Sequence, residues 1–212
     1  MEYHIDHYIV GPVATNCYIL VNEDAKEAVV VDPGAAAGPL HDKIVEDGYT
    51  PVAILLTHGH FDHAGGVSDL VSLFPDRDIP VYAYKGERQT LEDPKYNLSG
   101  NMGVEAKRYS ATDYLEDDEV FEVAGFRIKL LFTPGHTPGG CCFYLEDQKL
   151  CFTGDTLFNG SVGRTDFYGG SMSELVRSIN EKLLTLPDDT TCYPGHDSLT
   201  TIGDERVHNP FL

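Results

Sequence analysis

The feature that most constrains this chain is a set of four apolar runs, each of which ends in a turn that carries glycine or proline and metal-type ligands. The runs are AILLTHGHFDH, IKLLFTPGHT, LCFTGDT and TCYPGHD. Such runs predict buried strands, and strand ends are rigid platforms on which sheet proteins present functional groups. The side chains presented here are His58, His60, Asp62, His63, His136, Asp155 and His196. Together they predict one shared metal site.

The spacing within HGHFDH has a direct physical interpretation. His58 and His60 are two residues apart, so in an extended chain their side chains lie on the same face and can chelate one ion. A turn into a following helix directs Asp62 and His63 toward a second ion close by, and the neighbouring glycines permit that tight path. A single strand-end histidine is usually a surface or capping residue. Four ligand-type residues within so short a segment indicate metal binding instead.

The ligand types indicate which metals fit. Imidazole and carboxylate suit Zn²⁺, Fe²⁺ or Mn²⁺, and seven ligands exceed what one tetrahedral ion can use. We therefore expect two divalent metal ions, zinc first, with iron or manganese as alternatives. Asp155, at the end of its own strand, is the candidate bridge. A bridging water whose pKa falls from near 16 toward roughly 7 would provide hydroxide, and Asp62 is the predicted catalytic residue that orients this nucleophile.

The net charge narrows the range of partners. With 34 acidic against 15 basic residues, the formal net charge is -19, which repels phosphate backbones and anionic lipid surfaces. We expect a small-molecule substrate and neither nucleic acid nor a membrane, while the oligomeric state stays open. The start MEYHIDHYIVG does not resemble a signal peptide and no apolar run is long enough to span a membrane, so we expect a cytoplasmic protein. The five cysteines lack C-x-x-C spacing and are expected to be reduced, mostly buried thiols.

The chain is long enough for one domain with a substantial core, and we expect a single domain over residues 1–212. Short apolar runs between turns predict strands at 3–10, 17–21, 28–31, 52–56, 119–123, 126–132, 141–145, 149–152 and 190–193. Helical spacing of apolar residues predicts helices at 39–47, 64–74 and 173–186. Residues 84–110 are polar and irregular and are expected to form an insertion with some helix near the substrate. The pattern favours an α/β fold of layered sheets flanked by helices.

The motifs THGHFDH, TPGHT, TGDT and YPGH, with TNCYIL at 15–20 and VVDPG at 30–34, resemble those of the metallo-β-lactamase superfamily, and within it the glyoxalase II-like hydrolases. The resemblance implies an αββα sandwich, with two mixed β-sheets flanked by helices and a dinuclear site at one edge. It also implies how the ligands are divided between the ions. One ion would be bound by His58, His60 and His136, the other by Asp62, His63 and His196, and Asp155 would bridge them.

The resemblance implies a thioester hydrolase that acts on an anionic thioester such as S-lactoylglutathione. Glyoxalase II proper carries a further helical domain that completes its glutathione pocket, whereas this chain stops at Leu212. It is similar instead to the short single-domain proteins of bacteria, which share an ERxxNPFL-like end like that at 205–212. We therefore expect cleavage of glutathione thioesters with only a weak requirement for the glutathione moiety.

Other functions remain open at this point. Persulfide dioxygenases share the fold and ligand pattern, hold a single iron, and carry a GRTDF-like loop similar to residues 163–167. In that case His58, His136 and Asp155 would bind the iron. A lactone hydrolase fits the same site. A non-catalytic metal-binding module needs a closed site, which seven ligands around two ions do not make.

Two residues each have two open interpretations. Asp32 would orient a ligand histidine, since ligand imidazoles usually need a carboxylate or carbonyl partner, or it would serve as a turn residue before Pro33. Arg164 would contact an anionic substrate or be a solvated loop residue. The remaining histidines have no comparable strand-end context and are expected to be surface or local hydrogen-bonding groups: His4, His7, His41 and His208.

Overall fold

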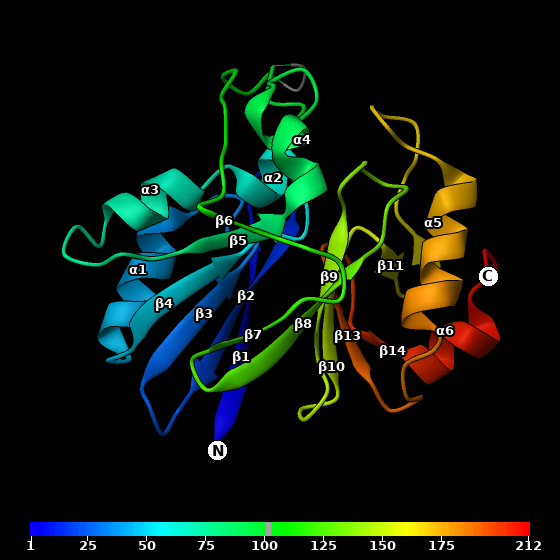
Figure 1. The fold of residues 1–212 in the computed structure, drawn as a ribbon. Helices are drawn as coiled ribbons and strands as arrows, with labels where there is room; N and C mark the ends of the chain where they lie inside the picture. Colours follow the sequence, from blue (N-terminus) through cyan, green and yellow to red (C-terminus); the bar gives the residue numbers. More distant parts are fainter. Residues whose placement is uncertain (101–102) are drawn as a thin grey trace.

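Two six-stranded sheets face each other in this computed structural model, which describes residues 1–100 and 103–212 (Figure 1). The first sheet has its strands in chain order: β1 (Tyr3–Val10), β2 (Thr15–Asn22), β3 (Glu27–Val31), β4 (Thr50–Leu55), β5 (Val81–Tyr84) and β6 (Asp113–Leu115). β1, β2 and β3 pair antiparallel, and β3 to β6 pair parallel. This sheet is therefore mixed.

The second sheet has the order β14-β13-β10-β9-β8-β7. Its strands are β7 (Val120–Val123), β8 (Phe126–Phe132), β9 (Cys141–Leu145), β10 (Leu150–Gly154), β13 (Thr191–Pro194) and β14 (Thr200–Thr201). β10 and β13 pair parallel and the other neighbours pair antiparallel, so this sheet is mixed as well. A separate hairpin joins β11 (Leu157–Phe158) to β12 (Ser161–Val162).

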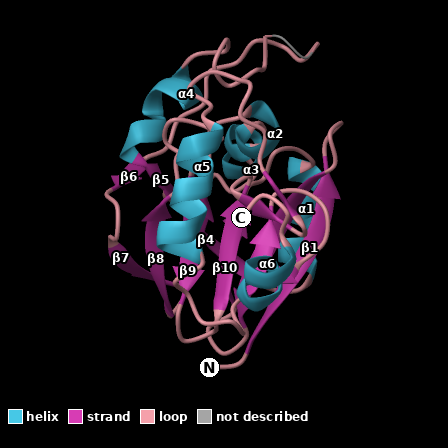
Figure 2. Ribbon diagram, turned by 90° about the vertical axis from the view of Figure 1, so that its right-hand side faces the viewer, coloured by secondary structure: helices cyan, strands magenta, loops and turns pink. Residues whose placement is uncertain are grey.

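Helices cover the outer face of each sheet. In Figure 1, α1 (Ala37–Glu46) and α3 (Val67–Ser72) lie outside the first sheet, while α5 (Met172–Ser178), its continuation η2 (Ile179–Leu183) and α6 (Ile202–His208) lie outside the second. α2 (Phe61–Ala64) and α4 (Arg88–Glu92), which follows η1 (Lys85–Glu87), lie at one end of the sheets, at the top of Figures 1 and 2. The predicted αββα arrangement is confirmed. No helix within the described residues is long and apolar enough to cross a membrane.

The central strand β2 shows how the layers are held together. All eight of its residues are buried. Cys17, Ile19 and Val21 pack in the apolar layer that also contains side chains of α1 and α3, whereas Tyr18 and Leu20 pack in the layer between the two sheets. Successive side chains of a strand point to opposite faces, so one strand serves both layers. Full burial of each such apolar side chain contributes about 1.5–3 kcal/mol.

The strand predictions are confirmed within two residues at each end, and so is the helix at 39–47, which is α1. The pattern did not indicate the short strands β5, β6, β11, β12 and β14 or the helices α4 and α6. Strands of two to four residues contain too few positions to display a period. The predicted insertion at 84–110 contains η1 and α4, and its residues 101 and 102 lie outside the described residues. The single-domain assignment stays a prediction.

Two predicted helices need correction. The helix predicted at 64–74 is wrong as a single element, because the chain forms α2 and then α3, with a break at Gly65 and Gly66. The loop after β3 packs into this break so closely that a Cβ on Gly66 would lie 2.4 Å from the carbonyl oxygen of Pro33. The helix predicted at 173–186 changes from α-helical to π-helical at Ile179 and ends at Leu183.

Candidate metal centre

The loops that carry the predicted ligands all leave the sheets at the same end. The HGHFDH segment follows β4 of the first sheet and continues into α2. His136, Asp155 and His196 follow β8, β10 and β13 of the second sheet. β10 and β13 are parallel, and β8 and β10 both run antiparallel to β9 between them, so these three strands end at one edge. The topology therefore gathers residues that are far apart in the chain.

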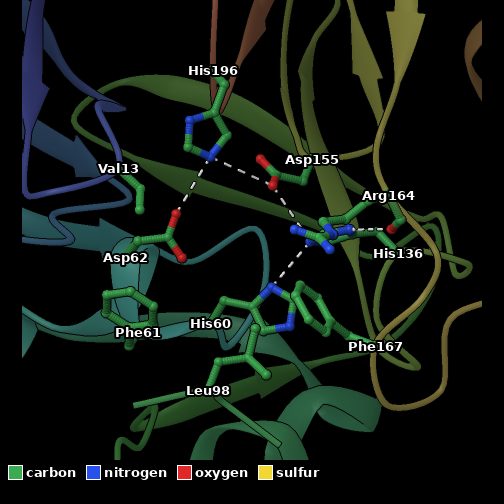
Figure 3. Close-up of a pocket in the computed structure, with 10 residues that line it drawn as sticks. All are labelled: Val13, His60, Phe61, Asp62, Leu98, His136, Asp155, Arg164, Phe167 and His196. Atoms are coloured by element: carbon green, nitrogen blue, oxygen red, sulfur yellow. Dashed lines mark hydrogen bonds and ion pairs between the residues drawn. The ribbon is translucent and has the colours of Figure 1, made fainter. Parts of the chain in front are cut away.

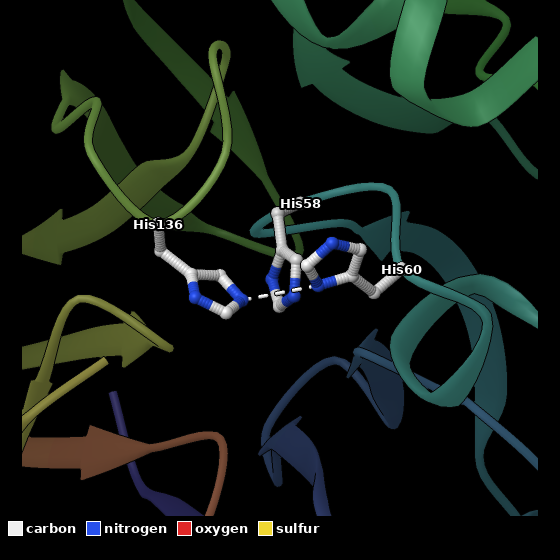
Figure 4. Close-up of side chains that lie close together, drawn as sticks. All are labelled: His58, His60 and His136. Atoms are coloured by element: carbon white, nitrogen blue, oxygen red, sulfur yellow. Dashed lines mark hydrogen bonds between the residues drawn. The ribbon is translucent and has the colours of Figure 1, made fainter. Parts of the chain in front are cut away.

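Three histidines form the first ligand group. The rings of His58, His60 and His136 lie edge to face, with centroids 4.7–4.8 Å apart (Figure 4). His136 Nε2 lies 3.0 Å from His60 Nδ1. Burial lowers the pKa of all three imidazoles, that of His60 to about 3. Neutral imidazoles have a free lone pair at neutral pH, which is the form that binds a metal ion.

A second group lies beside the first and contains Asp62, His63 and His196. Asp62 Oδ2 lies 3.4 Å from His63 Nε2 and 3.3 Å from His196 Nε2. Asp155 stands between the two groups, with Oδ1 3.4 Å from His63 Nε2 and Oδ2 3.4 Å from His136 Nε2. Burial alone would raise the pKa of Asp155, but His63 and the other histidines lower it to about 2. Asp155 is thus a carboxylate within reach of both groups.

The donor atoms of this cluster fit divalent metal ions. Among the described residues, His58 Nε2, His63 Nε2 and Asp155 Oδ1 are buried without a hydrogen-bond partner. Buried polar atoms without a partner are costly, so their presence in one cluster indicates a site that binds a cation. The ligand atoms of each of three groups lie within 4.8 Å of one another. Two of these groups contain the residues of the partition that the family resemblance implied. Their occupancy and the catalytic role of Asp62 stay predictions.

Asp32 lies behind the second group. It is 2% exposed, and it accepts hydrogen bonds from the Thr57 backbone amide (2.9 Å) and hydroxyl (2.6 Å). Its Oδ2 also lies 2.9 Å from His63 Nδ1, which leaves Nε2 of that ring directed at Asp62 and Asp155. Of the two interpretations of Asp32, the structure favours the orienting carboxylate. Loss of such an outer partner typically weakens metal binding about 10–100-fold.

Two polar residues at the start of β2 were not identified from the sequence. The Thr15 hydroxyl donates to Asp62 Oδ2 at 2.9 Å. The Asn16 side chain donates to the carbonyls of Pro194 and Asp197, each at 2.9 Å, and so holds the loop that carries His196. The available signal was a pair of polar residues that opens an otherwise apolar strand, which by itself does not indicate what the residues contact.

One small pocket opens onto the ligand cluster (Figure 3). It has a volume of about 140 Å³ and is lined by Val13, His60, Phe61, Asp62, Leu98, His136, Asp155, Arg164, Phe167 and His196. Leu98 belongs to the predicted insertion, so that segment contributes to the pocket wall. The Arg164 guanidinium is paired with Asp166 at 2.7 Å and lies over the Phe167 ring, and its backbone carbonyl lies 2.7 Å from His136 Nδ1. Arg164 therefore lines the site with its charge already partnered.

The four histidines that have no strand-end context have local partners. His4 lies 2.8 Å from Glu23, and His41 lies 3.0 Å from Asp42. His208 Nδ1 lies 3.2 Å from a carbonyl oxygen within its own helix. His7 stacks on the Tyr18 ring and lies 2.7 Å from Asn16 Oδ1, so it steadies the side chain that holds the His196 loop. The prediction for these residues is confirmed.

Comparison with known proteins gives a consistent result. The family model described as the Metallo-beta-lactamase superfamily matches residues 10–196. A probable metallo-hydrolase of Bacillus subtilis (strain 168), YqgX, is 41% identical over 204 residues, which are 96% of this chain and 94% of that protein. The hydroxyacylglutathione hydrolase GloC of Haemophilus influenzae is 37% identical over 199 residues, 93% and 92% of the two chains.

Two solved structures are similar over almost their whole length. The BLEG-1 B3 metallo-beta-lactamase has a TM-score of 0.92 and 41% identity, with 99% of both chains covered. A di-iron-bound form of TTHA1623 has a TM-score of 0.84 and 35% identity, with 98% of this chain and 100% of that chain covered. The metal named for this second protein is iron.

Proposed function

Because this chain belongs to the metallo-beta-lactamase superfamily, in which its relatives are metallo-hydrolases, we propose that it is a thioester hydrolase of the glyoxalase II type. The observation that carries the proposal is the convergence of two ligand groups on Asp155 beside one small, partly apolar pocket. The 37% identity to a hydroxyacylglutathione hydrolase supports the thioester as the substrate class. We propose two zinc ions as the cofactors, with iron or manganese as alternatives.

The residues of the site would have different roles in this reaction. Two bound divalent ions would supply a water molecule of lowered pKa and would polarise the substrate carbonyl. One ion would be held by the three-histidine group and the other by Asp62, His63 and His196, with Asp155 between them. Asp62 lines the pocket while Thr15 fixes its Oδ2, so the carboxylate is placed to orient the attacking water. Water adds to the carbonyl carbon and the C–S bond breaks, which yields a carboxylic acid and a thiol.

The shape of the pocket supports a short acyl group. A volume of about 140 Å³ is less than the roughly 300–1,000 Å³ of pockets that enclose drug-sized ligands. Val13, Phe61, Leu98 and Phe167 present apolar surface beside the ligand cluster and would exclude bulk water from the acyl group (Figure 3). We place the lactamase activity named for the similar BLEG-1 structure second to the thioester cleavage named for GloC.

A persulfide dioxygenase with a single iron is the second candidate function. The observation that favours it is the GRTDF segment at 163–167, whose Arg164 and Phe167 line the pocket. Lactone hydrolysis uses the same carbonyl chemistry as thioester hydrolysis and belongs in the same comparison. We propose a cytoplasmic location, which the five unpaired, buried cysteines support.

Purified protein assayed against four substrates tests the proposal. We expect thiol release from S-lactoylglutathione, slower turnover of a lactone and a chromogenic cephalosporin, and no oxygen uptake with glutathione persulfide. Metal analysis of protein purified without added metal is expected to find two ions per chain. Oxygen uptake without thioester cleavage, together with one iron per chain, would move the assignment to the dioxygenase.

The glutathione moiety is expected to add little to catalysis. We expect kcat/KM for S-lactoylglutathione to exceed that for a truncated lactoyl thioester by only about tenfold, or about 1.4 kcal/mol. Binding of the glutathione moiety can raise the rate only where a pocket holds that moiety. Arg164, which lines the pocket, is already paired with Asp166. Steady-state kinetics on both substrates measures the ratio.

A much larger ratio would contradict this view of the substrate site. Lys85, Arg88 and Arg108 line a separate hollow of about 420 Å³, but Lys85 pairs with Glu116 and Arg88 with Glu92. A preference of a thousandfold or more would show that this hollow or a partner subunit binds the two carboxylates of the tripeptide.

A further inference from the structure

Glu87 is a buried carboxylate that the proposed chemistry does not use. It ends η1, at the start of the segment 84–110, and only 1% of it is exposed. Nothing in the sequence around it, KGERQ, indicates a metal or catalytic site. A carboxylate is rarely buried to this extent unless it is paired or hydrogen-bonded, so its partners show its role.

Each oxygen of Glu87 is bound to a different ligand loop. Oε1 accepts a hydrogen bond from the Gly59 amide at 2.8 Å, and Gly59 lies between His58 and His60. Oε2 accepts from the Gly139 amide at 2.8 Å, and Gly139 follows His136 by three residues. Gly59 is 28 residues before Glu87 and Gly139 is 52 residues after it, so one side chain links two loops from different sheets.

The three histidines depend on the relative position of these two loops. His60 Nδ1 and His136 Nε2 are 3.0 Å apart, and these two histidines lie on the two different loops that Glu87 joins. A metal ion binds tightly only when its ligands are held close to the coordination geometry in advance. A shift of the Gly139 loop by a fraction of an ångström would therefore move His136 and change the first ligand group, but leave the second, whose members do not lie on that loop.

We propose that Glu87 is a positioning residue that holds His58 and His60 in register with His136, and so sets the metal affinity of the three-histidine group. The inference rests on the metal centre of the proposed function, but not on the thioester as substrate. Glu87 does not line the pocket, so it acts through the ligands and not on the substrate.

The Glu87→Gln variant is the direct test. Glutamine keeps one acceptor oxygen but turns an NH₂ donor toward a backbone N–H, so one of the two links is lost. The backbone bond from the Cys141 amide to the Thr57 carbonyl (2.9 Å) still joins the same loops where β9 begins, so we expect the variant to fold. Circular dichroism and thermal unfolding of the metal-free protein check this.

Glu205→Gln is a matched control. Glu205 is 3% exposed, and it too accepts hydrogen bonds from a backbone amide, that of Gly160. It also accepts from Thr200 and Asn209 in the region of α6, away from the three histidines. Both substitutions therefore replace one oxygen of a buried carboxyl group that holds a loop, but only Glu87 holds the loops of the first ligand group.

Zinc titration against a chromophoric chelator in a His196→Ala background reads the first group directly, because that substitution removes a ligand of the second ion. We expect Glu87→Gln to weaken zinc binding in this background by roughly 10–100-fold, with Glu205→Gln within about twofold of the parent. Glu87→Asp keeps both oxygens but withdraws them by one C–C bond, and it is expected to fall between Glu87→Gln and the parent. If Glu87→Gln does not fold, the zinc affinity of Glu87→Asp tests the inference instead.

Unchanged zinc affinity in the Glu87 variants would overturn the inference, and so would an equal loss in Glu205→Gln, because the role would then be general stability. The titration does not involve a thioester, so its result remains valid even if the protein does not hydrolyse thioesters. A parent protein that binds no zinc would instead contradict the metal centre itself.

Discussion

Asp155→Ala is expected to lose most of its bound metal at both positions. Asp155 lies 3.4 Å from a histidine of each ligand group, so the substitution takes a ligand from both ions. The loss of affinity should exceed the roughly 10–100-fold that removal of an outer partner costs. Metal content per chain, measured after dialysis against metal-free buffer, checks the prediction.

His196→Ala is the comparison for this experiment. His196 is a member of the second group only, and it is 23% exposed at the side of the pocket, so its loss should deplete one ion and leave the other. Two ions per chain in Asp155→Ala after dialysis would reject the bridge. Equal depletion in both variants would show that the two ions bind only together.

Complete loss of thioester hydrolysis on chelation is the second large effect that we expect. Without metal, the pKa of water stays near 15.7, and the site offers only imidazoles and carboxylates to a carbonyl group. Activity should return when zinc, manganese or iron is added to the dialysed protein, because the buried ligands remain close together. The assay follows thiol release before chelation, after it and after each metal is added.

Asp155→Ala serves as the control for restoration, since added metal should not restore its activity. Hydrolysis that continues after metal analysis finds none bound would contradict a metal-dependent mechanism. In that case Asp62 or another side chain would have to activate the water alone.

The seven predicted ligands could be identified from the sequence because each lies within a few residues of the end of a short apolar run. The residues that predict a strand also predict where the strand ends, and the turn that follows is recognised from its own residues. The HGHFDH segment is dense enough to indicate metal binding without any knowledge of its neighbours. The helix at 64–74 was predicted wrongly because its break depends on Pro33, a residue in a distant loop that packs against Gly66.

The contacts that hold the ligands in place could not be predicted in this way, although an orienting role was one of the two interpretations of Asp32. Asp32 reaches His63 from 31 positions away, Thr15 reaches Asp62 from 47, and Glu87 reaches Gly139 from 52. The motifs around Asp32 and Thr15 contribute to the family resemblance, but no local pattern shows which side chain or amide each of the three residues contacts. Their roles exist only because the two sheets face each other and bring separate loops to one end.

The sequence by itself determined the strand ends, the ligand types and therefore the presence of a metal site, since these follow from local periodicity and from the chemistry of the side chains. Local spacing separated His58 and His60 from Asp62 and His63, but only the tertiary structure decided how close the later ligands lie to them, which nitrogen of each imidazole faces the centre, and how small the pocket is. These properties depend on distances across the interface between the sheets, to which residues from both sheets and from α2 contribute. Hydrogen bonds between residues so far apart in the chain depend on the packed core, so no local pattern records them.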